Sequence, residues 1–244
     1  MSKILLVTGG SRGIGAAIVR QAAQQGYDVA INYLRDAAAA DALSAEVRAA
    51  GRRAITIQGD MAQEADVDRT FKAMDTDLGR LTHLVYNAGT TGGYSRLEDA
   101  DNAMMRNVLE LNVLGALMCV KAAATRMSAK KGGQGGAIVL ISSMAATLGS
   151  AGEYVWYAAS KGAVDTMTVG LSRELAADNI RVNALSPGLI DTTLHPPGRL
   201  ERLAPMMPIP RAGTPDEVAG AVMFLLSEAS SYTTGTNIRV AGGR

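Results

Sequence analysis

The feature that most constrains this chain of 244 residues is a regular alternation of short β-rich runs with longer helical patterns. Most of the β-rich runs are continuously apolar, as is typical of strands that helices cover on both faces. The alternation predicts repeated βαβ units around a parallel sheet, which is an α/β fold. The expected strands cover residues 3–8, 27–33, 53–60, 81–87, 136–142, 180–185 and 237–240.

The helical patterns lie between these strands and leave no obvious boundary between domains. They are clearest over residues 14–25, 37–50, 99–127 and 154–177. No linker or change of composition interrupts them, so we expect a single domain over residues 1–244. The segment 191–215 breaks the rhythm because it holds most of the seven prolines. We expect it to be a lid over a site, with a structural loop as the alternative.

Composition excludes several classes of function. Lys and Arg total 24 against 23 Asp and Glu, so no net charge attracts nucleic acid or an anionic membrane. Partners should therefore be small molecules bound in a pocket. Cys119 is the only cysteine, and His83 and His195 lie far apart, so we expect no disulfide and no metal site. The N-terminal apolar run is too short for a signal sequence, which favours a cytoplasmic, soluble protein.

A glycine-rich turn follows the first expected strand. It reads Thr-Gly-Gly-Ser-Arg-Gly-Ile-Gly over residues 8–15 and leads directly into a helix. Glycines allow a sharp turn, and the N–H groups of a helix N-terminus bind phosphate. A glycine-rich turn alone is a weak signal, but its position after the first strand of a βαβ unit predicts a dinucleotide site.

Tyr157 and Lys161 are four residues apart, so a helix would place both on one face. An ammonium about 4 Å from a phenol, at an effective dielectric near 20, stabilises the tyrosinate by roughly 4 kcal/mol. That is about the energy needed to bring the phenol pKa from about 10 to about 7. The pair could thus perform acid/base chemistry, although the same spacing is common on solvated helices.

Together these motifs resemble the classical short-chain dehydrogenase/reductase family. Its T-G-x-x-x-G-x-G turn is followed here, in family order, by Asn87-Ala88-Gly89, by Asn112, by Ser142-Ser143, by Tyr157 to Lys161, and by Pro187-Gly188. The elements cover nearly the whole chain. The resemblance implies a Rossmann-type, doubly wound parallel sheet with helices on both faces.

The resemblance also implies catalytic roles for Asn112, Ser143, Tyr157 and Lys161. Tyrosine exchanges a proton with the substrate oxygen, and lysine lowers the tyrosine pKa and binds the nicotinamide ribose. Serine holds the substrate oxygen, and asparagine holds a water in a proton relay. Because neighbouring residues of a strand face opposite ways, only one serine can face Tyr157; alignment favours Ser143, and Ser142 remains the alternative.

The cofactor expected from the resemblance is NADP, with NAD the less favoured alternative. The second strand ends in Asn32-Tyr33-Leu34-Arg35, without the acidic residue that binds the ribose hydroxyls of NAD, and Arg12 precedes Gly13. Arg35 is uncertain in either role. The expected cofactor contacts, apart from the catalytic Tyr157 and Lys161, are Gly9, Ser11, Arg12, Ile14, Asn32, Tyr33, Asp60, Met61, Asn87, Ala88, Gly89, Pro187, Gly188, Ile190 and Thr192.

The implied activity is hydride transfer between the nicotinamide and a carbonyl or alcohol, as in 3-oxoacyl-carrier-protein reductases and glucose dehydrogenases. Alternatives are a sugar or polyol dehydrogenase and a non-catalytic NADP-binding regulatory protein. Arg126, Lys130 and Lys131 are a candidate patch for an acidic carrier protein. The family is commonly tetrameric, so we expect a homo-oligomer, a tetramer or a dimer. The chain carries Ala241 where members often have aspartate before two glycines, which leaves the oligomer in doubt.

Overall fold

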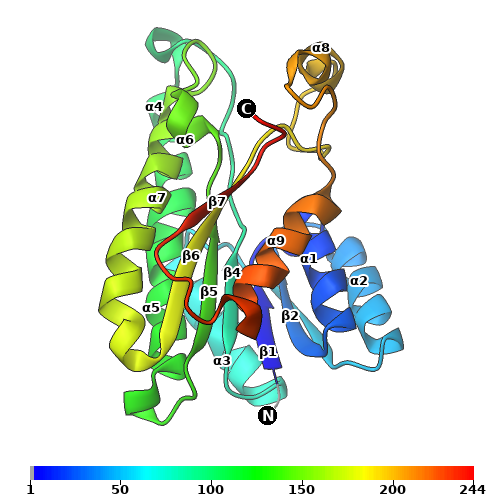
Figure 1. Ribbon diagram of the computed structural model, residues 1–244, viewed down its shortest axis with the longest axis vertical. Helices are drawn as coiled ribbons and strands as arrows, with labels where there is room; N and C mark the ends of the chain where they lie inside the picture. Colours follow the sequence, from blue (N-terminus) through cyan, green and yellow to red (C-terminus); the bar gives the residue numbers. More distant parts are fainter. Residues whose placement is uncertain (1–2) are drawn as a thin grey trace.

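A seven-stranded parallel sheet forms the centre of the molecule in a computed structural model that describes residues 3–244. The strand order is β3-β2-β1-β4-β5-β6-β7 (Figure 1). The strands are β1 (Lys3–Val7), β2 (Tyr27–Tyr33), β3 (Ala54–Gln58), β4 (His83–Tyr86), β5 (Gly136–Ile141), β6 (Ile180–Pro187) and β7 (Asn237–Val240). Each expected strand is therefore confirmed, with ends that differ by up to two residues.

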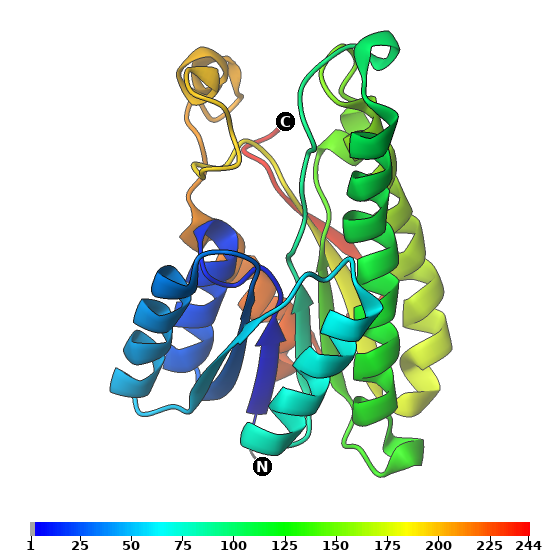
Figure 2. The same ribbon diagram turned by 180° about the vertical axis from the view of Figure 1, so that it is seen from behind.

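Helices cover both faces of the sheet. They are α1 (Gly13–Gln24), α2 (Ala37–Ala49), α3 (Glu64–Asp77), α4 (Asn102–Leu109), α5 (Gly115–Met127), α6 (Ala145–Leu148), α7 (Val155–Leu175), α8 (Arg199–Leu203) and α9 (Pro215–Leu226). One layer holds α1, α2 and α9, and the other holds α3, α4, α5 and α7 (Figures 1 and 2). This is the expected doubly wound α/β fold.

Alternate residues of β1 belong to two separate hydrophobic cores. Leu5 and Val7 pack with Ile18 of α1 and Val222 of α9 on one face. Ile4 and Leu6 pack on the other face with side chains from α3, α5 and α7. Because both faces are covered, the inner strands of the sheet show little alternation in sequence, whereas the edge strand β7 alternates exposed and half-buried residues.

The connections between strands contain elements that the sequence patterns did not indicate. Helices α3 and α9 were not among the expected helical stretches, and α8 lies inside the segment expected to be a lid. The helix expected over 99–127 begins later, where the Asp101 carboxylate caps α4 by accepting hydrogen bonds from the amides of Ala103 and Met104. A π-helical segment at Glu110–Leu114 joins α4 to α5.

The continuous helical stretch Asn102–Met127 is long and apolar enough to cross a membrane, by length and composition only. One such helix is weak support for a membrane span, because core helices of globular domains have the same properties. In this structure Val120, Ala123 and Met127 pack against the sheet.

The order of the strands reverses beside β1, which pairs with β2 on one side and β4 on the other. In open parallel sheets a crevice forms at this point, beyond the carboxyl ends of the strands. The glycine-rich turn after β1 and Asn87-Ala88-Gly89 after β4 both lie there. The fold therefore brings two of the expected motifs to the same edge of the sheet.

Candidate active site

The turn between β1 and α1 requires glycine at several positions. Gly9 has φ of 58° and Gly13 has φ of 53°, a conformation that other residues rarely adopt. A Cβ at Gly15 would lie 2.4 Å from the carbonyl oxygen of Gly9. The first turn of α1 receives no side-chain hydrogen bond from its N-cap, Arg12. The turn thus has the shape and the free helix terminus that fit a bound pyrophosphate.

Two asparagines hold this turn in place. Asn32, which is buried, accepts a hydrogen bond from the Gly9 amide and donates to the carbonyl oxygens of Ile57 and Gly59. Asn87 donates to the carbonyl oxygens of Thr8 and Gly9 at 3.1 and 2.9 Å. Because these amide groups are committed to the backbone, both side chains brace the turn from within the protein.

The other residues expected to surround the adenine end differ in exposure. Arg12 and Arg35 are exposed, Tyr33 and Asp60 are half-buried, and Met61 is buried. The Met61 side chain packs in the core beside Cys119, with 3.7 Å between the two sulfur atoms. It therefore faces away from the expected site and leaves only its backbone for contact. Asp36 follows Arg35, and its carboxylate caps α2 by accepting from the Ala39 amide.

Asn112 lies in the π-helical segment and is fully buried. Its side chain accepts a hydrogen bond from the Thr90 amide and donates to the Thr90 carbonyl and the Ser160 hydroxyl, each at 3.0 Å. The irregular helix leaves the Leu111 carbonyl free to accept from the Tyr86 hydroxyl at 2.5 Å. Such π segments often occur at functional sites, where they redirect a side chain.

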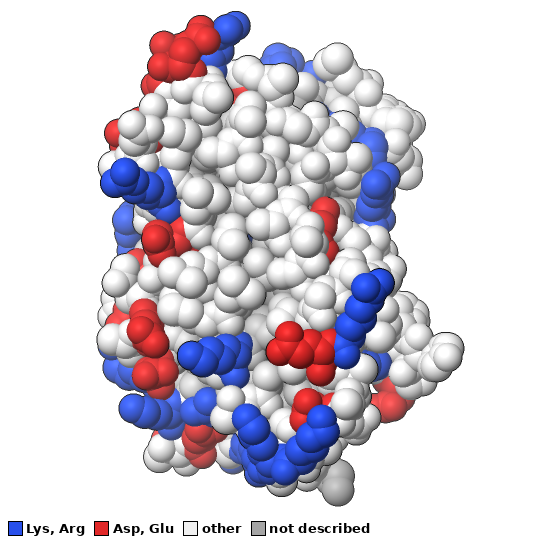
Figure 3. Space-filling model, turned by 90° about the vertical axis from the view of Figure 1, so that its left-hand side faces the viewer, with Lys and Arg blue, Asp and Glu red and all other residues white. Residues whose placement is uncertain are grey.

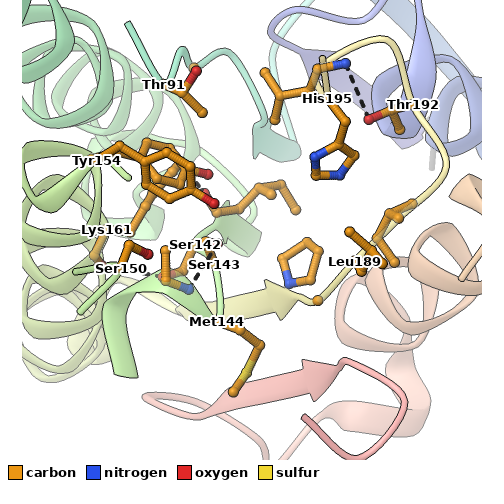
Figure 4. A pocket seen from close by; sticks show the side chains of 18 of the residues that line it. Thr91, Ser142, Ser143, Met144, Ser150, Tyr154, Lys161, Leu189, Thr192 and His195 are labelled. Carbon is orange, nitrogen blue, oxygen red and sulfur yellow. Dashed lines mark hydrogen bonds between the residues drawn. The ribbon is translucent and has the colours of Figure 1, made fainter. Parts of the chain in front are cut away.

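Of the two serines that follow β5, Ser143 is the one beside Tyr157. A hydrogen bond between the Ser143 and Tyr157 hydroxyls lowers the pKa of Tyr157, although burial acts more strongly in the opposite direction. Ser142 is buried instead, and its one hydroxyl proton is shared between two acceptors, the Lys161 carbonyl oxygen at 3.2 Å and the Asp165 carboxylate. Figure 4 shows both serines on the same side of the pocket as Lys161, Ser150 and Tyr154, with Met144 below them.

Tyr157 and Lys161 lie one turn apart on α7, as their spacing predicts, and both are buried. The Lys161 ammonium nitrogen lies 5.7 Å from the centre of the Tyr157 ring and donates to the Ile141 carbonyl at 2.7 Å. Burial raises the pKa of Tyr157 to about 12 and lowers the pKa of Lys161 to about 8. In the protein alone desolvation dominates the pKa of Tyr157, and the opposing effect comes from the Ser143 hydrogen bond. The lowering of this pKa by Lys161 stays a prediction for the cofactor-bound site.

A cavity of about 130 Å³ joins these groups to the cofactor-side residues. Its lining includes Ile14, Asn87, Gly89, Ser143, Tyr157, Lys161, Pro187, Gly188, Ile190 and Thr192. These sequence-predicted site residues therefore meet from α1, α7 and the ends of β4, β5 and β6. The other predicted residues do not line this cavity: Gly9, Ser11, Arg12, Asn32, Tyr33, Asp60, Met61, Ala88 and Asn112. Gly89 brings the backbone close to both groups, because a Cβ there would lie 3.4 Å from the Lys161 ammonium nitrogen and 3.2 Å from Asn112 Oδ1.

The segment 191–215 supplies one wall of the same cavity. Leu194, His195 and Arg199 line the cavity, and His195 points into it from the segment opposite Tyr154 (Figure 4). Burial and, secondly, the Arg199 charge lower the pKa of His195. Sequence reasoning missed Tyr94, Tyr154 and Arg199, and their only signal was proximity to predicted segments.

The predicted basic patch lies elsewhere. Arg126 forms an ion pair with Asp75 at 2.7 Å, and Lys130 lies 3.5 Å from Asp178. These residues are at the end of α5 and in the connection to β5, at the opposite end of the molecule from α8 (Figure 1). The patch therefore does not border the pocket.

Comparisons with known proteins agree with the motifs and the fold. Residues 9–244 match a family described as enoyl-(acyl carrier protein) reductase. The chain is 46% identical to the uncharacterized oxidoreductase YgfF of Escherichia coli K12, over 99% of each chain. It is 36% identical to a 3-oxoacyl-[acyl-carrier-protein] reductase of Synechocystis, over 99% of this chain and 96% of that one.

A solved structure has the same fold. A short-chain dehydrogenase from Burkholderia cenocepacia J2315, determined in complex with NADP, superposes with a TM-score of 0.92 at 37% identity. The match covers 99% of this chain and 97% of that one. The chain therefore belongs to the short-chain dehydrogenase/reductase family of oxidoreductases.

Proposed function

We propose that this oxidoreductase uses NADP to transfer hydride between the nicotinamide and a carbonyl or secondary alcohol group of a small substrate. The observation that carries the proposal is the convergence of Ser143, Tyr157 and Lys161 on a cavity that also borders the glycine-rich turn. A carbonyl group placed there would meet two hydroxyl groups at the position where a proton has to be delivered.

In this proposal Tyr157 is the general acid in reduction. When bound, NADPH would supply hydride to the carbonyl carbon. The Tyr157 hydroxyl gives its proton to the substrate oxygen, and Ser143 donates a hydrogen bond that holds this oxygen and then the phenolate. Lys161 stabilises the phenolate until a proton from solvent restores the phenol. Asn112 acts by shaping the backbone around Thr90, and the water relay expected for it remains part of the proposal.

The pKa of Tyr157 defines the resting form of the site. At a pKa of about 12 the phenol keeps its proton at neutral pH. Reduction forms the tyrosinate that oxidation starts from, so both directions need this anion to be stabilised by Ser143 and Lys161. The direction of the reaction therefore has to come from the substrate screen.

The preference for NADP over NAD rests on charge near the adenine ribose. Exposed Arg12 and Arg35 flank the turn, and neither forms an ion pair with a carboxylate within residues 3–244. Asp36, the nearest acid in sequence, is committed to capping α2. Arg12 is therefore available to pair with a 2′-phosphate, and Arg35 is a second candidate, whereas the ribose hydroxyls of NAD would lack an acidic partner.

The substrate pocket is lined by apolar and hydrogen-bonding side chains together. Leu148, Leu189 and Leu194 line it, as do Thr91, Ser150, His195 and Arg199. The leucines favour a small ketone, or the 3-oxoacyl group that the Synechocystis relative is named for, and the polar residues keep a sugar or polyol as the second candidate. In this proposal residues 1–244 act as one domain, with 191–215 as its lid.

We also propose that the protein is a homo-oligomer. The side of the molecule formed by α4, α5 and α7 has few charged side chains over its middle (Figure 3). Leu109, Leu114, Leu117, Val155 and Val169 on these helices are exposed. An apolar surface of this kind is typical of contacts between subunits. Measurement of the mass in solution would test this, and a monomer would contradict it.

The decisive experiment screens purified protein with NADPH against small ketones and 3-oxoacyl thioesters, and with NADP against sugars. Tyr157→Phe should bind NADPH as the natural protein does but lose turnover by about 10²–10⁴-fold, the usual contribution of a general acid. Tyr232→Phe is the matched control, because Tyr232 is fully exposed, and it should keep full turnover. Turnover that survives in Tyr157→Phe would contradict the assignment.

A further inference from the structure

Arg199 is a buried cation in a segment that otherwise lies at the surface. It is the first residue of α8, and only 5% of it is exposed, whereas Pro196, Pro197 and Gly198 before it are exposed. Burying a guanidinium is unfavourable unless its charge and its N–H groups are paired. Its partners should therefore reveal what the residue does.

Those partners belong to the opposite wall of the pocket. Arg199 donates to both carboxylate oxygens of Glu153, at 2.6 and 2.8 Å, and to the Tyr154 hydroxyl at 2.9 Å. Its guanidinium carbon lies 5.2 Å from the Tyr94 ring centre and 5.6 Å from that of Tyr154. A two-point ion pair with stacking on aromatic rings is a geometry that lysine cannot reproduce.

Arg199 reaches these partners through its side chain alone, and the partners lie in other segments of the chain. Tyr94 lies in the connection between β4 and α4, Glu153 and Tyr154 directly precede α7, and Arg199 belongs to the segment after β6. In both ribbon views α8 stands apart from the other helices (Figures 1 and 2). The Arg199 side chain therefore bridges the space between α8 and the wall formed by α6 and α7.

The same side chain separates two cavities. Tyr94 and Arg199 line the active-site cavity and also line an outer groove of about 390 Å³ bordered by Ser95, Gly152, Glu153, Pro196 and Arg202. Withdrawal of Arg199 from Glu153 would connect the groove with the cavity. The ion pair is suited to reversible opening because Glu153 is not fully buried: its side chain is 32% exposed.

The arrangement also reaches the catalytic tyrosine. Tyr154 packs edge to face against Tyr157, with 5.3 Å between ring centres, and against Tyr94 at 4.9 Å. Arg199 holds the Tyr154 hydroxyl from the other side. Release of Arg199 would therefore loosen the ring that packs against Tyr157.

We propose that the Arg199–Glu153 pair is a latch that holds α8 closed over the active-site cavity, and that ligands pass through the outer groove when it opens. Arg199 is thus a positioning residue. That the ligand is a carbonyl substrate rests on the proposed function, but the latch itself is defined by contacts between protein groups. Its test can therefore be independent of turnover.

The first test measures amide hydrogen exchange of the natural protein and of Glu153→Gln. Glutamine keeps the shape of the side chain but removes the charge. We expect peptides within 191–206 to exchange roughly tenfold faster or more, because Glu153→Gln leaves the buried Arg199 charge without its counter-ion, while α1 and α2 are unchanged. Glu46→Gln is the matched control, because it removes another two-point ion pair, with Arg20, far from α8.

A second readout uses Trp156, the only tryptophan. Its indole donates to the Thr91 carbonyl at 2.8 Å, in the same connection that carries Tyr94, and the residue is 5% exposed. Acrylamide should quench its fluorescence more strongly in Glu153→Gln than in the natural protein or in Glu46→Gln. Arg199→Lys, which keeps the charge but not the two-point contact, should give intermediate exchange and quenching.

The latch would be refuted by unchanged exchange in 191–206 in both Glu153→Gln and Arg199→Lys, or by an equal change in Glu46→Gln. If Glu153→Gln were unfolded, α1 and α2 would exchange faster too, and Arg199→Lys would then decide. The two proposals can fail separately. If no substrate were turned over in the screen but residues 191–206 exchanged faster in Glu153→Gln, the proposed function would be contradicted and the latch would still be supported.

Discussion

Lys161 is buried in a site where its charge is costly, and this cost can be measured through its dependence on pH. Burial lowers the pKa of Lys161 from 10.5 to about 8. The lysine of the unfolded chain therefore holds its proton over a range of pH in which the folded protein has released it. Stability rises with pH wherever the unfolded state binds more protons, so this group destabilises the fold fully below pH 8, and the penalty disappears towards pH 10.5.

The magnitude follows from the two pKa values. The penalty is about 3 kcal/mol at pH 7 and less than about 1 kcal/mol at pH 10. Lys161→Met removes the penalty together with the 2.7 Å hydrogen bond to the Ile141 carbonyl, whose loss costs about 1–3 kcal/mol at any pH. The difference in stability between variant and natural protein should therefore move by about 2.5 kcal/mol between pH 7 and pH 10, in favour of the natural protein.

The assay is urea unfolding of both proteins at several values of pH in this range. Lys72→Met, at an exposed position of α3, controls for the substitution itself. The comparison between variants cancels the titration of other groups. A difference between Lys161→Met and the natural protein that stays constant from pH 7 to pH 10 would refute the assignment of a strongly desolvated lysine.

Two further substitutions test the cofactor side of the site. Arg12→Ala should weaken NADPH binding about tenfold in a fluorescence titration while NADH binding changes little, because only the 2′-phosphate loses a charged partner; equal effects on the two would count against NADP. Gly15→Ala should lower the free energy of unfolding by about 1–3 kcal/mol in a denaturant titration, because its Cβ would lie 2.4 Å from the Gly9 carbonyl oxygen. Unchanged stability would show that the turn can relax.

The fold was accessible from the sequence because burial leaves a direct mark on residue patterns. β1 reads as a continuous apolar run since Leu5 and Leu6 point into different cores, and each is fully buried. α3 was harder to detect because it is short of apolar residues and buries only Val67, Thr70, Phe71 and Met74. The π-helical segment has no such mark, because it depends on contacts such as that between Tyr86 and the Leu111 carbonyl.

The site was predictable where local spacing or a family motif determines position. Spacing places Tyr157 and Lys161 on one face, and alignment selected Ser143, which lies beside Tyr157. The side chains of Asn32 and Met61 were placed near the cofactor by their position in sequence, but the fold directs them inward. The role of Arg199 could not be predicted because it depends on Glu153 and Tyr154, which lie 46 and 45 positions earlier in the chain.

The pKa values of the catalytic pair also depend on the fold and not on local spacing alone. Spacing specifies that an ammonium and a phenol are neighbours, but it does not specify how much water surrounds them. With a pKa of about 12 for Tyr157 and about 8 for Lys161, the neutral pair is favoured over the tyrosinate and ammonium by about 5 kcal/mol. The tyrosinate therefore requires another source of stabilisation in the pocket, whether it forms as the base of oxidation or as the product of proton donation in reduction.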